Sequence, residues 1–394
     1  MTYIDEVQLE GKRVLIRCDF NVPIKNGEIQ DDSRIRAVLP TLRHIMEQGG
    51  KAIACSHLGK PKGQADPSLS LEPVAKRLSE LLERQVGMAP DCVGSDVEAM
   101  VDALGPGQVL LLENLRYHAG ETKDDPDFSR QLGALADVYV NDAFGVVHRA
   151  HASVSGVTRH VEIACAGLLL KKEVEYLGKA LANPDHPFVL ISGGAKVSTK
   201  LGILNNLLDK VDRIIVGGAM ANSFRKAEGY DVGRSFVEEE LMSDAKQVMH
   251  KALDRGVSFY LPVDYVLGEG LEASQPLGVF PYQDIPREGM ILDTGPASHT
   301  LFSEVLKDAR TVVWNGPMGA FENPAFSQGS FGLAQSVAGL DALTIVGGGD
   351  TDALIHGCGL AEDIDFISTG GGSFLEFLEG KELPGLKALG ILPG

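Results

Sequence analysis

The stretch TIVGGGDTDALIH, residues 344–356, predicts a buried strand, then three glycines, then Asp350 and Thr351 at the start of a helix. Free backbone N–H groups at a helix start bind anions, and phosphate is a common one. The stretch lacks the lysine of the common phosphate loop. A phosphate site here therefore needs positive charge from elsewhere in the chain.

Apolar runs alternate with helical patterns through the rest of the sequence. Helical spacing of apolar residues marks 35–46, despite Pro40 inside it, and 71–85. The apolar runs that predict buried strands are 13–21, 51–59, 108–117, 138–145, 188–196, 213–220, 258–265, 311–319, 343–350 and 365–372. Continuous apolar strands that alternate with helices indicate parallel sheets covered on both faces. We therefore expect an α/β fold with two doubly wound, Rossmann-like parallel-sheet domains.

The division between the two domains is expected near the middle of the 394 residues. Residues 167–184 carry one apolar stripe, and Asn183-Pro184 ends the helical pattern. We interpret 169–183 as an interdomain helix between an N-terminal domain, 1–168, and a C-terminal domain, 184–379. The alternative is an ordinary surface helix of one domain.

Composition excludes several classes of protein. The net charge of −18 argues against a nucleic-acid partner, which selects basic surfaces. The five cysteines form no CxxC pair, so we expect reduced thiols rather than a disulfide frame or a zinc site. The histidines at 57, 148 and 151 have no metal-ligand partner at regular spacing. With no apolar leader and no run long enough to span a bilayer, the chain is expected in the cytoplasm, away from membranes.

The ends of the predicted strands differ between the two halves. Ligands of open parallel sheets bind beyond the carboxyl ends of the strands. In the first half these ends are polar or charged, as at Asp19, Asn21, His57, Lys60, Arg116 and Arg149. In the second half they are glycines, at 193–194, 217–218, 316, 347–349 and 370–372. Arginine and histidine suit a small acid or phosphate, and glycines suit a nucleotide, so the pattern predicts a transfer between the two ligands.

The missing positive charge has a candidate in GGAKVSTK, residues 193–200. Lys196 and Lys200 lie four residues apart, and we expect them on one face of the helix that starts there. Two ammonium groups repel unless an anion such as a triphosphate lies beside them. A solvated lysine pair is the alternative, and the position directly after a strand and two glycines favours the phosphate site.

Eight longer motifs carry a family resemblance. They are RCDFNVP (17–23), SHLGKPKG (56–63), ENLRYHAGE (113–121), NDAFGVVHRAHAS (141–153), GGAKVSTKL (193–201), VVWNGPMGAFE (312–322), VGGGDT (346–351) and STGGGSFLEFLEGKELPG (368–385). In this order they resemble the phosphoglycerate kinase family over essentially the whole chain. The resemblance implies a usually monomeric, Mg²⁺-dependent glycolytic enzyme with two hinged domains. It also implies that 380–394 packs back on the N-terminal domain.

The resemblance implies reversible transfer of the acyl phosphate of 1,3-bisphosphoglycerate to ADP, giving 3-phosphoglycerate and ATP. The implied substrate-binding residues are Asp19, Asn21, Arg34, His57, Leu58, Gly59, Lys60, Arg116 and Arg149. The implied nucleotide-binding residues are Lys196, Lys200, Gly217, Gly218, Gly295, Asn315, Gly316, Glu322, Gly348, Gly349, Asp350 and Thr351, with Asp350 on Mg²⁺. The implied catalytic groups are Arg34, Lys196, Lys200, Gly349 and Gly371.

The sequence departs from the family pattern at three places. Lys60 stands where arginine is common, which keeps the charge but loses the planar fork that grips phosphate. Val146 and Cys18 replace a common threonine and valine, and both are expected to affect packing only. Two other functions stay open: a nucleotide-binding scaffold without catalysis, and a nicotinamide-dependent dehydrogenase, although the chain has no GxGxxG fingerprint.

Overall fold

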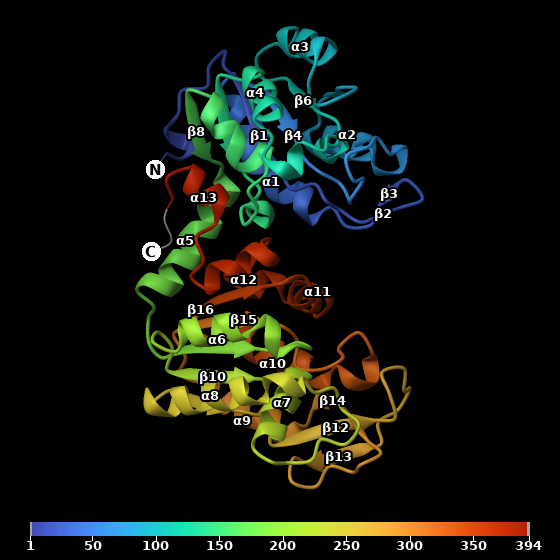
Figure 1. The fold of residues 1–394 in the computed structure, drawn as a ribbon, viewed down its shortest axis with the longest axis vertical. Helices are drawn as coiled ribbons and strands as arrows, with labels where there is room; N and C mark the ends of the chain where they lie inside the picture. Colours follow the sequence, from blue (N-terminus) through green and yellow to red (C-terminus); the bar gives the residue numbers. More distant parts are fainter. Residues whose placement is uncertain (1, 392–394) are drawn as a thin grey trace. The chain divides into compact units, whose positions relative to one another are not determined.

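The computed structural model describes residues 2–391. The chain divides into two compact units. Among the described residues, unit 1 comprises 2–175 and 382–391, and unit 2 comprises 176–381. The two units are described separately below (Figure 1).

Unit 1 is built around a six-stranded parallel sheet with the order β5-β6-β4-β1-β7-β8. Its strands are β1 (Arg13–Arg17), β4 (Lys51–Cys55), β5 (Val86–Met88), β6 (Val109–Leu111), β7 (Val138–Asn141) and β8 (Ile163–Ala166). Its main helices are α1 (Ser33–Glu47), α2 (Glu72–Leu82), α3 (Ser95–Asp102), α4 (Pro126–Ala134) and α13 (Pro384–Ala388), with α5 (Leu168–Ala182) at its boundary. Successive strand residues such as Val14, Leu15 and Ile16 are all fully buried, so both faces of the sheet are covered.

Unit 2 repeats this architecture with the strand order β11-β10-β9-β15-β16-β17, again all parallel. The strands are β9 (Phe188–Ser192), β10 (Arg213–Val216), β11 (Ser258–Tyr260), β15 (Thr311–Asn315), β16 (Leu343–Gly347) and β17 (Phe366–Ser368). The helices are α6 (Leu201–Leu207), α7 (Met220–Ala227), α8 (Met242–Asp254), α9 (Pro296–Leu306), α10 (Gln328–Ala338), α11 (Gly349–Gly357) and α12 (Gly372–Leu378). The predicted fold class, two parallel-sheet α/β domains, is confirmed.

Helix α1 forms in spite of the proline inside it. Pro40 lies on the exposed side of the helix, while Ile35, Val38 and Leu42 are buried against the sheet. Burial of this apolar stripe offsets the cost of the backbone hydrogen bond that proline cannot donate.

The prediction of one continuous strand over 258–265 was wrong. It divides at Leu261-Pro262 into β11 and β12 (Asp264–Gly268), and β12 belongs to a separate antiparallel sheet with the order β13-β12-β14. Proline has no N–H to donate to a ladder, which ends β11 here. The sequence patterns also missed β13 (Gly278–Pro281), β14 (Met290–Thr294), β5, β8, and the short pair β2 (Ile24–Lys25) and β3 (Glu28–Ile29).

The boundary between the units falls inside α5, between Glu175 and Tyr176. The start of α5 is fixed by a buried carboxylate at the end of β7, because Asp142 Oδ1 accepts the N–H groups of Leu169 and Leu170 at 2.9 and 3.1 Å. Burial raises the pKa of Asp142 to about 7, against the effect of these hydrogen bonds.

The segment after Lys381 returns to unit 1. Gly385 donates its N–H to the Val147 carbonyl at 2.8 Å, and a Cβ at Gly385 would meet Val147 and Val154. The leucines at 383, 386 and 389 are buried. Residues 392–394, the end of the segment that the resemblance implied would pack on this domain, lie outside the described residues.

We expect Asp142→Asn to remove a pH-dependent loss of stability. Between the ordinary pKa of 3.8 and about 7, the folded chain holds a proton on Asp142 that the unfolded chain has lost. The free energy of unfolding therefore falls as the pH rises through this range. Asparagine keeps the acceptor without the buried charge, so at pH 8 it should stabilise the fold by on the order of 1–4 kcal/mol. Melting temperatures of both proteins at pH 5 and pH 8 measure this, and an equal difference at both values would contradict it.

Candidate active site

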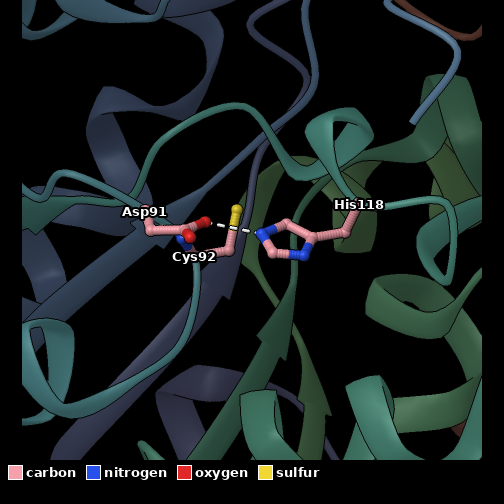
Figure 2. A group of neighbouring side chains, drawn as sticks. All are labelled: Asp91, Cys92 and His118. Carbon is pink, nitrogen blue, oxygen red and sulfur yellow. Dashed lines mark hydrogen bonds and ion pairs between the residues drawn. The ribbon is translucent and has the colours of Figure 1, made fainter. Parts of the chain in front are cut away.

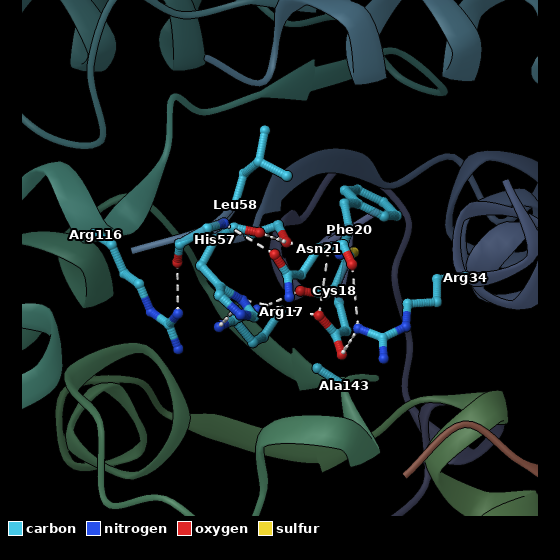
Figure 3. Close-up of polar contacts among 12 residues, drawn as sticks. Arg17, Cys18, Phe20, Asn21, Arg34, His57, Leu58, Arg116 and Ala143 are labelled. Atoms are coloured by element: carbon cyan, nitrogen blue, oxygen red, sulfur yellow. Dashed lines mark hydrogen bonds and ion pairs between the residues drawn. The ribbon is translucent and has the colours of Figure 1, made fainter. Parts of the chain in front are cut away.

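The candidate site of unit 1 lies beyond the carboxyl ends of its central strands. Asp19 and Asn21 follow β1, His57 follows β4, and Arg116 lies in a 3₁₀ turn, Leu115–Tyr117, that follows β6. Because these strands are parallel neighbours, their ends meet at one edge of the sheet. Figure 3 shows Arg34 and Arg116 on opposite sides of Asn21 and His57.

Arg34 projects from the first turn of α1 toward the end of β1. Its Nη1 donates to Asp19 Oδ2 at 3.1 Å and to the Asn21 carbonyl at 3.2 Å. The Arg34 side chain keeps 38% of its surface exposed, whereas that of Asp19 keeps 14%. Arg34 is therefore anchored at one nitrogen and still accessible to a ligand.

Beneath this surface lies a buried polar group that the sequence patterns missed. The fully buried Arg17 donates from Nε to Ser153 Oγ at 2.8 Å, and its Nη2 lies 3.3 Å from His57 Nδ1. Glu121, also fully buried, accepts from the Ser153 N–H and hydroxyl, and its Oε1 lies 4.0 Å from Arg17 Nη2. Since Arg17 has only donors, His57 Nδ1 must be the acceptor.

His57 is consequently neutral and carries its proton on Nε2. Burial, followed by the charges of Arg17 and Arg116, holds the pKa of His57 well below its ordinary value. A neutral imidazole with a fixed tautomer can donate one hydrogen bond to an anionic ligand.

Arg116 has a buried hydrogen-bond donor without a partner among the described residues, beside other positive charges. Its Nη1 donates to the Gly59 carbonyl at 2.7 Å, but its buried Nε has no hydrogen-bond partner among the described residues. Burial, and then the charges of Arg17 and Arg149, lower the pKa of Arg116 to about 10. Crowded positive charge with a free buried donor favours binding of a phosphate or carboxylate.

Arg149 is exposed, and its Nε donates to His148 Nε2 at 3.1 Å. Burial, and then the charge of Arg149, lower the pKa of His148 to about 4, so its ring is neutral near pH 7. The neutral His148 ring accepts a hydrogen bond that orients the Arg149 guanidinium, and it carries no positive charge that would compete for an anion.

The three residues that follow His57 in the predicted HLGK loop have different roles. The backbone N–H and C=O of Leu58 both bond to the side chain of Asn114, at 3.2 and 2.7 Å. The N–H of Gly59 donates to Asn21 Oδ1 at 2.9 Å. The Leu58 and Gly59 backbone groups therefore shape the loop, whereas the Lys60 side chain is exposed and can reach a ligand.

In unit 2 the strand ends surround a cavity of about 340 Å³. Nine residues predicted from the sequence line it: Lys196, Lys200, Asn315, Gly316, Gly348, Gly349, Asp350, Thr351 and Gly371. They come from the ends of β9, β15, β16 and β17, which are neighbours in the sheet. The two lysines and the glycine loop are thus brought together, although 150 residues of chain separate Lys200 from Asp350.

The expectation that Lys196 and Lys200 share a helix face was wrong. Lys196 has an extended backbone, a 3₁₀ turn covers Val197–Thr199, and α6 begins at Leu201. The carboxylate of Glu238 accepts from the N–H and hydroxyl of Ser198, which stabilises the turn and delays the helix. Lys196 is exposed, whereas Lys200 is 7% exposed and donates to Asn315 Oδ1.

The glycine loop is held by hydrogen bonds to the end of the neighbouring strand β15. Asn315 Nδ2 donates to the Gly347 carbonyl at 2.5 Å, and Thr351 Oγ1 accepts the N–H of Gly316 at 2.8 Å. Asn315 therefore orients both Lys200 and the loop. The first N–H groups of α11, which begins at Gly349, have no partner within the helix and can bind an anion.

We expect Gly348→Ala to weaken nucleotide binding at least tenfold. Gly348 has a φ of +97°, and a Cβ there would clash with Asn315 Nδ2, so the loop must shift away from its anion-binding geometry. Titration calorimetry with Mg-ADP measures the affinity. Gly357→Ala at the other end of α11 is the control, because its Cβ would meet no atom within 4 Å. Equal affinities of the two variants would contradict the role of the loop.

A second cavity of about 240 Å³ shares Gly194, Ala195 and Asp350 with the first. Its wall is largely apolar, with Tyr265, Leu271, Ile291, Leu292 and Met318, none of which the sequence patterns identified. A pocket lined by two lysines and a glycine loop that adjoins an apolar slot has the form of a nucleotide site.

The remaining predicted residues are placed unequally around this slot. Gly218 and Glu322 line it. Gly217 and Gly295 do not: a Cβ on Gly217 would meet Met318, and one on Gly295 would meet the carboxylate of Asp264. These two glycines permit close packing behind the site.

Comparisons with known proteins all give the same family, and the matches extend over nearly the whole chain. The family "Phosphoglycerate kinase" matches residues 4–381. The chain is 55% identical over 394 residues to a phosphoglycerate kinase of Maridesulfovibrio salexigens, covering 99% of each chain. It is 53% identical over 389 residues to one of Geobacter metallireducens, covering 98% of each. A solved phosphoglycerate kinase from Coxiella burnetii matches with a TM-score of 0.91 and 43% identity over 99% of this chain and 98% of that one. The chain therefore belongs to the phosphoglycerate kinase family.

Proposed function

We propose that the anion site of unit 1 and the nucleotide site of unit 2 are the two halves of one active site. As a member of its family, the chain is a glycolytic phosphotransferase with a carboxyl acceptor and ADP or ATP as substrate. It reversibly transfers the acyl phosphate of 1,3-bisphosphoglycerate to ADP. The residue assignments rest on two observations. The buried Arg116 Nε of unit 1 has no hydrogen-bond partner among the described residues, and a cavity at α11 of unit 2 is lined by two lysines.

The substrate site supplies hydrogen-bond donors and positive charge. Asp19 and Asn21 face the hydroxyl and carboxyl region of the glycerate. His57, Arg116, Arg149 and Lys60 hold its distant phosphate, and Leu58 and Gly59 shape that pocket. Arg34 reaches the transferring group from its anchor on Asp19.

The nucleotide site supplies alignment. Lys196, Lys200 and the N–H groups near Gly349 and Gly371 surround the phosphates, with Gly348, Thr351, Asn315 and Gly316 fixing the loop. Gly218 and Glu322 border the slot for the base and ribose, and Gly217 and Gly295 support its wall. A carboxylate and a diphosphate oxygen exchange the phosphoryl group in line, so no general base is required, and the positive groups stabilise the transition state.

Asp350 fits a Mg²⁺ ion that accompanies the nucleotide. Its carboxylate is exposed in the first turn of α11 and borders both cavities. One carboxylate together with phosphate oxygens and waters is the donor set that Mg²⁺ prefers. When bound, the ion neutralises charge on the phosphates.

Transfer requires the two ligands to touch, but each is held by a different unit. We therefore propose a closure around the interdomain helix 169–183, which separates domains 1–168 and 184–379, with 380–394 completing the first. Closure would also expel water that hydrolyses an acyl phosphate. Small-angle scattering should show a smaller radius of gyration when both substrates are bound, and an unchanged radius would contradict closure.

The location, oligomeric state and binding partners of the protein are also proposals. No helix among the described residues is long and apolar enough to cross a membrane. We propose a cytoplasmic monomer that binds small molecules and neither nucleic acid nor membranes, in keeping with its acidic composition.

The direct test is ATP formation from Mg-ADP and 1,3-bisphosphoglycerate by the purified chain. We expect turnover well above background. Nucleotide binding without turnover would instead favour a scaffold protein, and tight binding of NAD in place of ATP would favour a dehydrogenase.

A further inference from the structure

A group of three potential metal ligands lies outside both halves of the proposed active site. Asp91 and Cys92 follow β5, and His118 follows the 3₁₀ turn after β6. Strands β5 and β6 are parallel neighbours, so the segments that leave their carboxyl ends meet. Figure 2 shows the three side chains converging from these two segments.

The ligand atoms of Asp91, Cys92 and His118 all lie within 4.8 Å of one another. Asp91 Oδ1 is 2.5 Å from His118 Nε2, and the Cys92 thiol donates to the Glu113 carbonyl with Sγ at 3.0 Å. The Cys92 residue is fully buried, while Asp91 and His118 are partly exposed. The group is therefore closed by protein on the sulfur side and open to solvent on the other.

The ring of His118 is held in place. It stacks on Phe128 with a centroid distance of 4.8 Å and an interplanar angle of 20°. The N–H of Cys92 donates to Asp91 Oδ1 at 2.6 Å, which fixes the carboxylate relative to the thiol. These contacts orient the donor atoms before any ion binds.

We propose that Asp91, Cys92 and His118 bind a divalent transition-metal ion of the Zn²⁺ class. One sulfur, one imidazole nitrogen and one carboxylate oxygen are typical ligands of Zn²⁺ and Co²⁺, and sulfur is a poor ligand for Mg²⁺. Three protein ligands leave the fourth tetrahedral position to water from the open side.

The distances between the three ligand atoms are close to those of such a metal site. Bond lengths of about 2.0–2.3 Å place tetrahedral ligand atoms roughly 3–4 Å apart. The ion would displace the proton between Asp91 and His118 and that of the thiol, separating the first pair and drawing Sγ inward. Because the ligand atoms already lie within 4.8 Å of one another, shifts of about an ångström in these side chains suffice.

Cobalt titration of the chelator-treated full chain tests the proposal, because a thiolate ligand gives Co²⁺ an intense charge-transfer band in the near ultraviolet. We expect one equivalent of Co²⁺ to produce this band. Cys92→Ser should abolish it, and Asp91→Asn and His118→Gln, changes at partly exposed residues, should each weaken cobalt binding at least tenfold. Cys358→Ser is the matched control, because Cys358 is the one partly exposed thiol among the described residues.

Absence of the band at saturating Co²⁺ in the unmodified chain would overturn the site. So would a band that persists in Cys92→Ser or disappears in Cys358→Ser, since the thiolate would then be a different one. Should Cys92→Ser fail to fold, Asp91→Asn and His118→Gln still decide: unchanged cobalt affinity in both, in chains with unaltered circular dichroism, overturns the proposal.

Discussion

Lys200→Ala should lower turnover by at least tenfold, and by the order of 10²-fold if this ammonium acts mainly in the transition state. Lys200 is almost buried, and its Nζ is directed by Asn315 Oδ1 toward the cavity that contains the glycine loop. A positive charge held in a desolvated position interacts strongly with phosphate, and little free energy is needed to reorganise its surroundings. A tenfold loss corresponds to about 1.4 kcal/mol of barrier.

Steady-state assays in both directions measure this effect. Lys251→Ala is the control, since Lys251 is a lysine of the same unit that bonds to Asn205 at the surface. Turnover of Lys200→Ala close to that of the control would remove Lys200 from the mechanism.

The same lysine should set a limit on activity at high pH. Burial lowers the pKa of Lys200 to about 8, although Asp350 and Glu379 act in the opposite direction. The charged form is lost as the pH rises through this value, so kcat/KM, which reports on the free enzyme, should fall above about pH 8. Lys200→Arg keeps its charge through this range and should flatten the profile of its remaining activity. A decline that is identical in both proteins would assign it to another group.

Arg34→Ala should also lower turnover by more than tenfold, about 1.4 kcal/mol or more. The change removes a cation and leaves Asp19, its partner at 3.1 Å, as an uncompensated negative charge beside an anionic substrate. Both effects oppose the transferring phosphoryl group, so kcat should fall more than the substrate affinity does.

Arg36→Ala provides the comparison for Arg34→Ala. It removes the same side chain from the same helix, but Arg36 pairs with Asp32 at 2.8 Å on an exposed face. Near-normal kcat for Arg34→Ala would show that this arginine only shapes the substrate site. Arg34→Lys separates charge from geometry, because lysine cannot reproduce the planar fork.

The fold class could be predicted because its signals are local. Continuous apolar runs followed by helical spacing are readable one segment at a time, and the parallel sheets follow from their alternation. The antiparallel sheet of β12, β13 and β14 escaped because no helix alternates with its strands and β13 is half exposed. Pro262 was the signal that could have divided 258–265 correctly.

The candidate site was predictable where residues stand at strand ends, as Asp350 and Arg116 do. Groups that act through burial were not. Arg17 lies in a predicted buried strand, but its partners Ser153 and Glu121 are distant in the sequence and nothing local identifies them. Likewise, the cysteine spacing gave no sign that Cys92 approaches His118, because that approach depends on β5, a strand that the patterns missed. Such groups form through contacts between neighbouring strands, and the spacing of residues along the sequence does not show those contacts.

The return of the chain after Lys381 has a consequence for biosynthesis. A ribosome makes residues 382–391 only after the whole of unit 2, yet the buried leucines of this segment belong to the core of unit 1. The domain that is translated first thus acquires its last buried side chains after the domain that is translated second. A frameshift late in the reading frame would therefore damage unit 1, which contains the proposed substrate site, and spare unit 2.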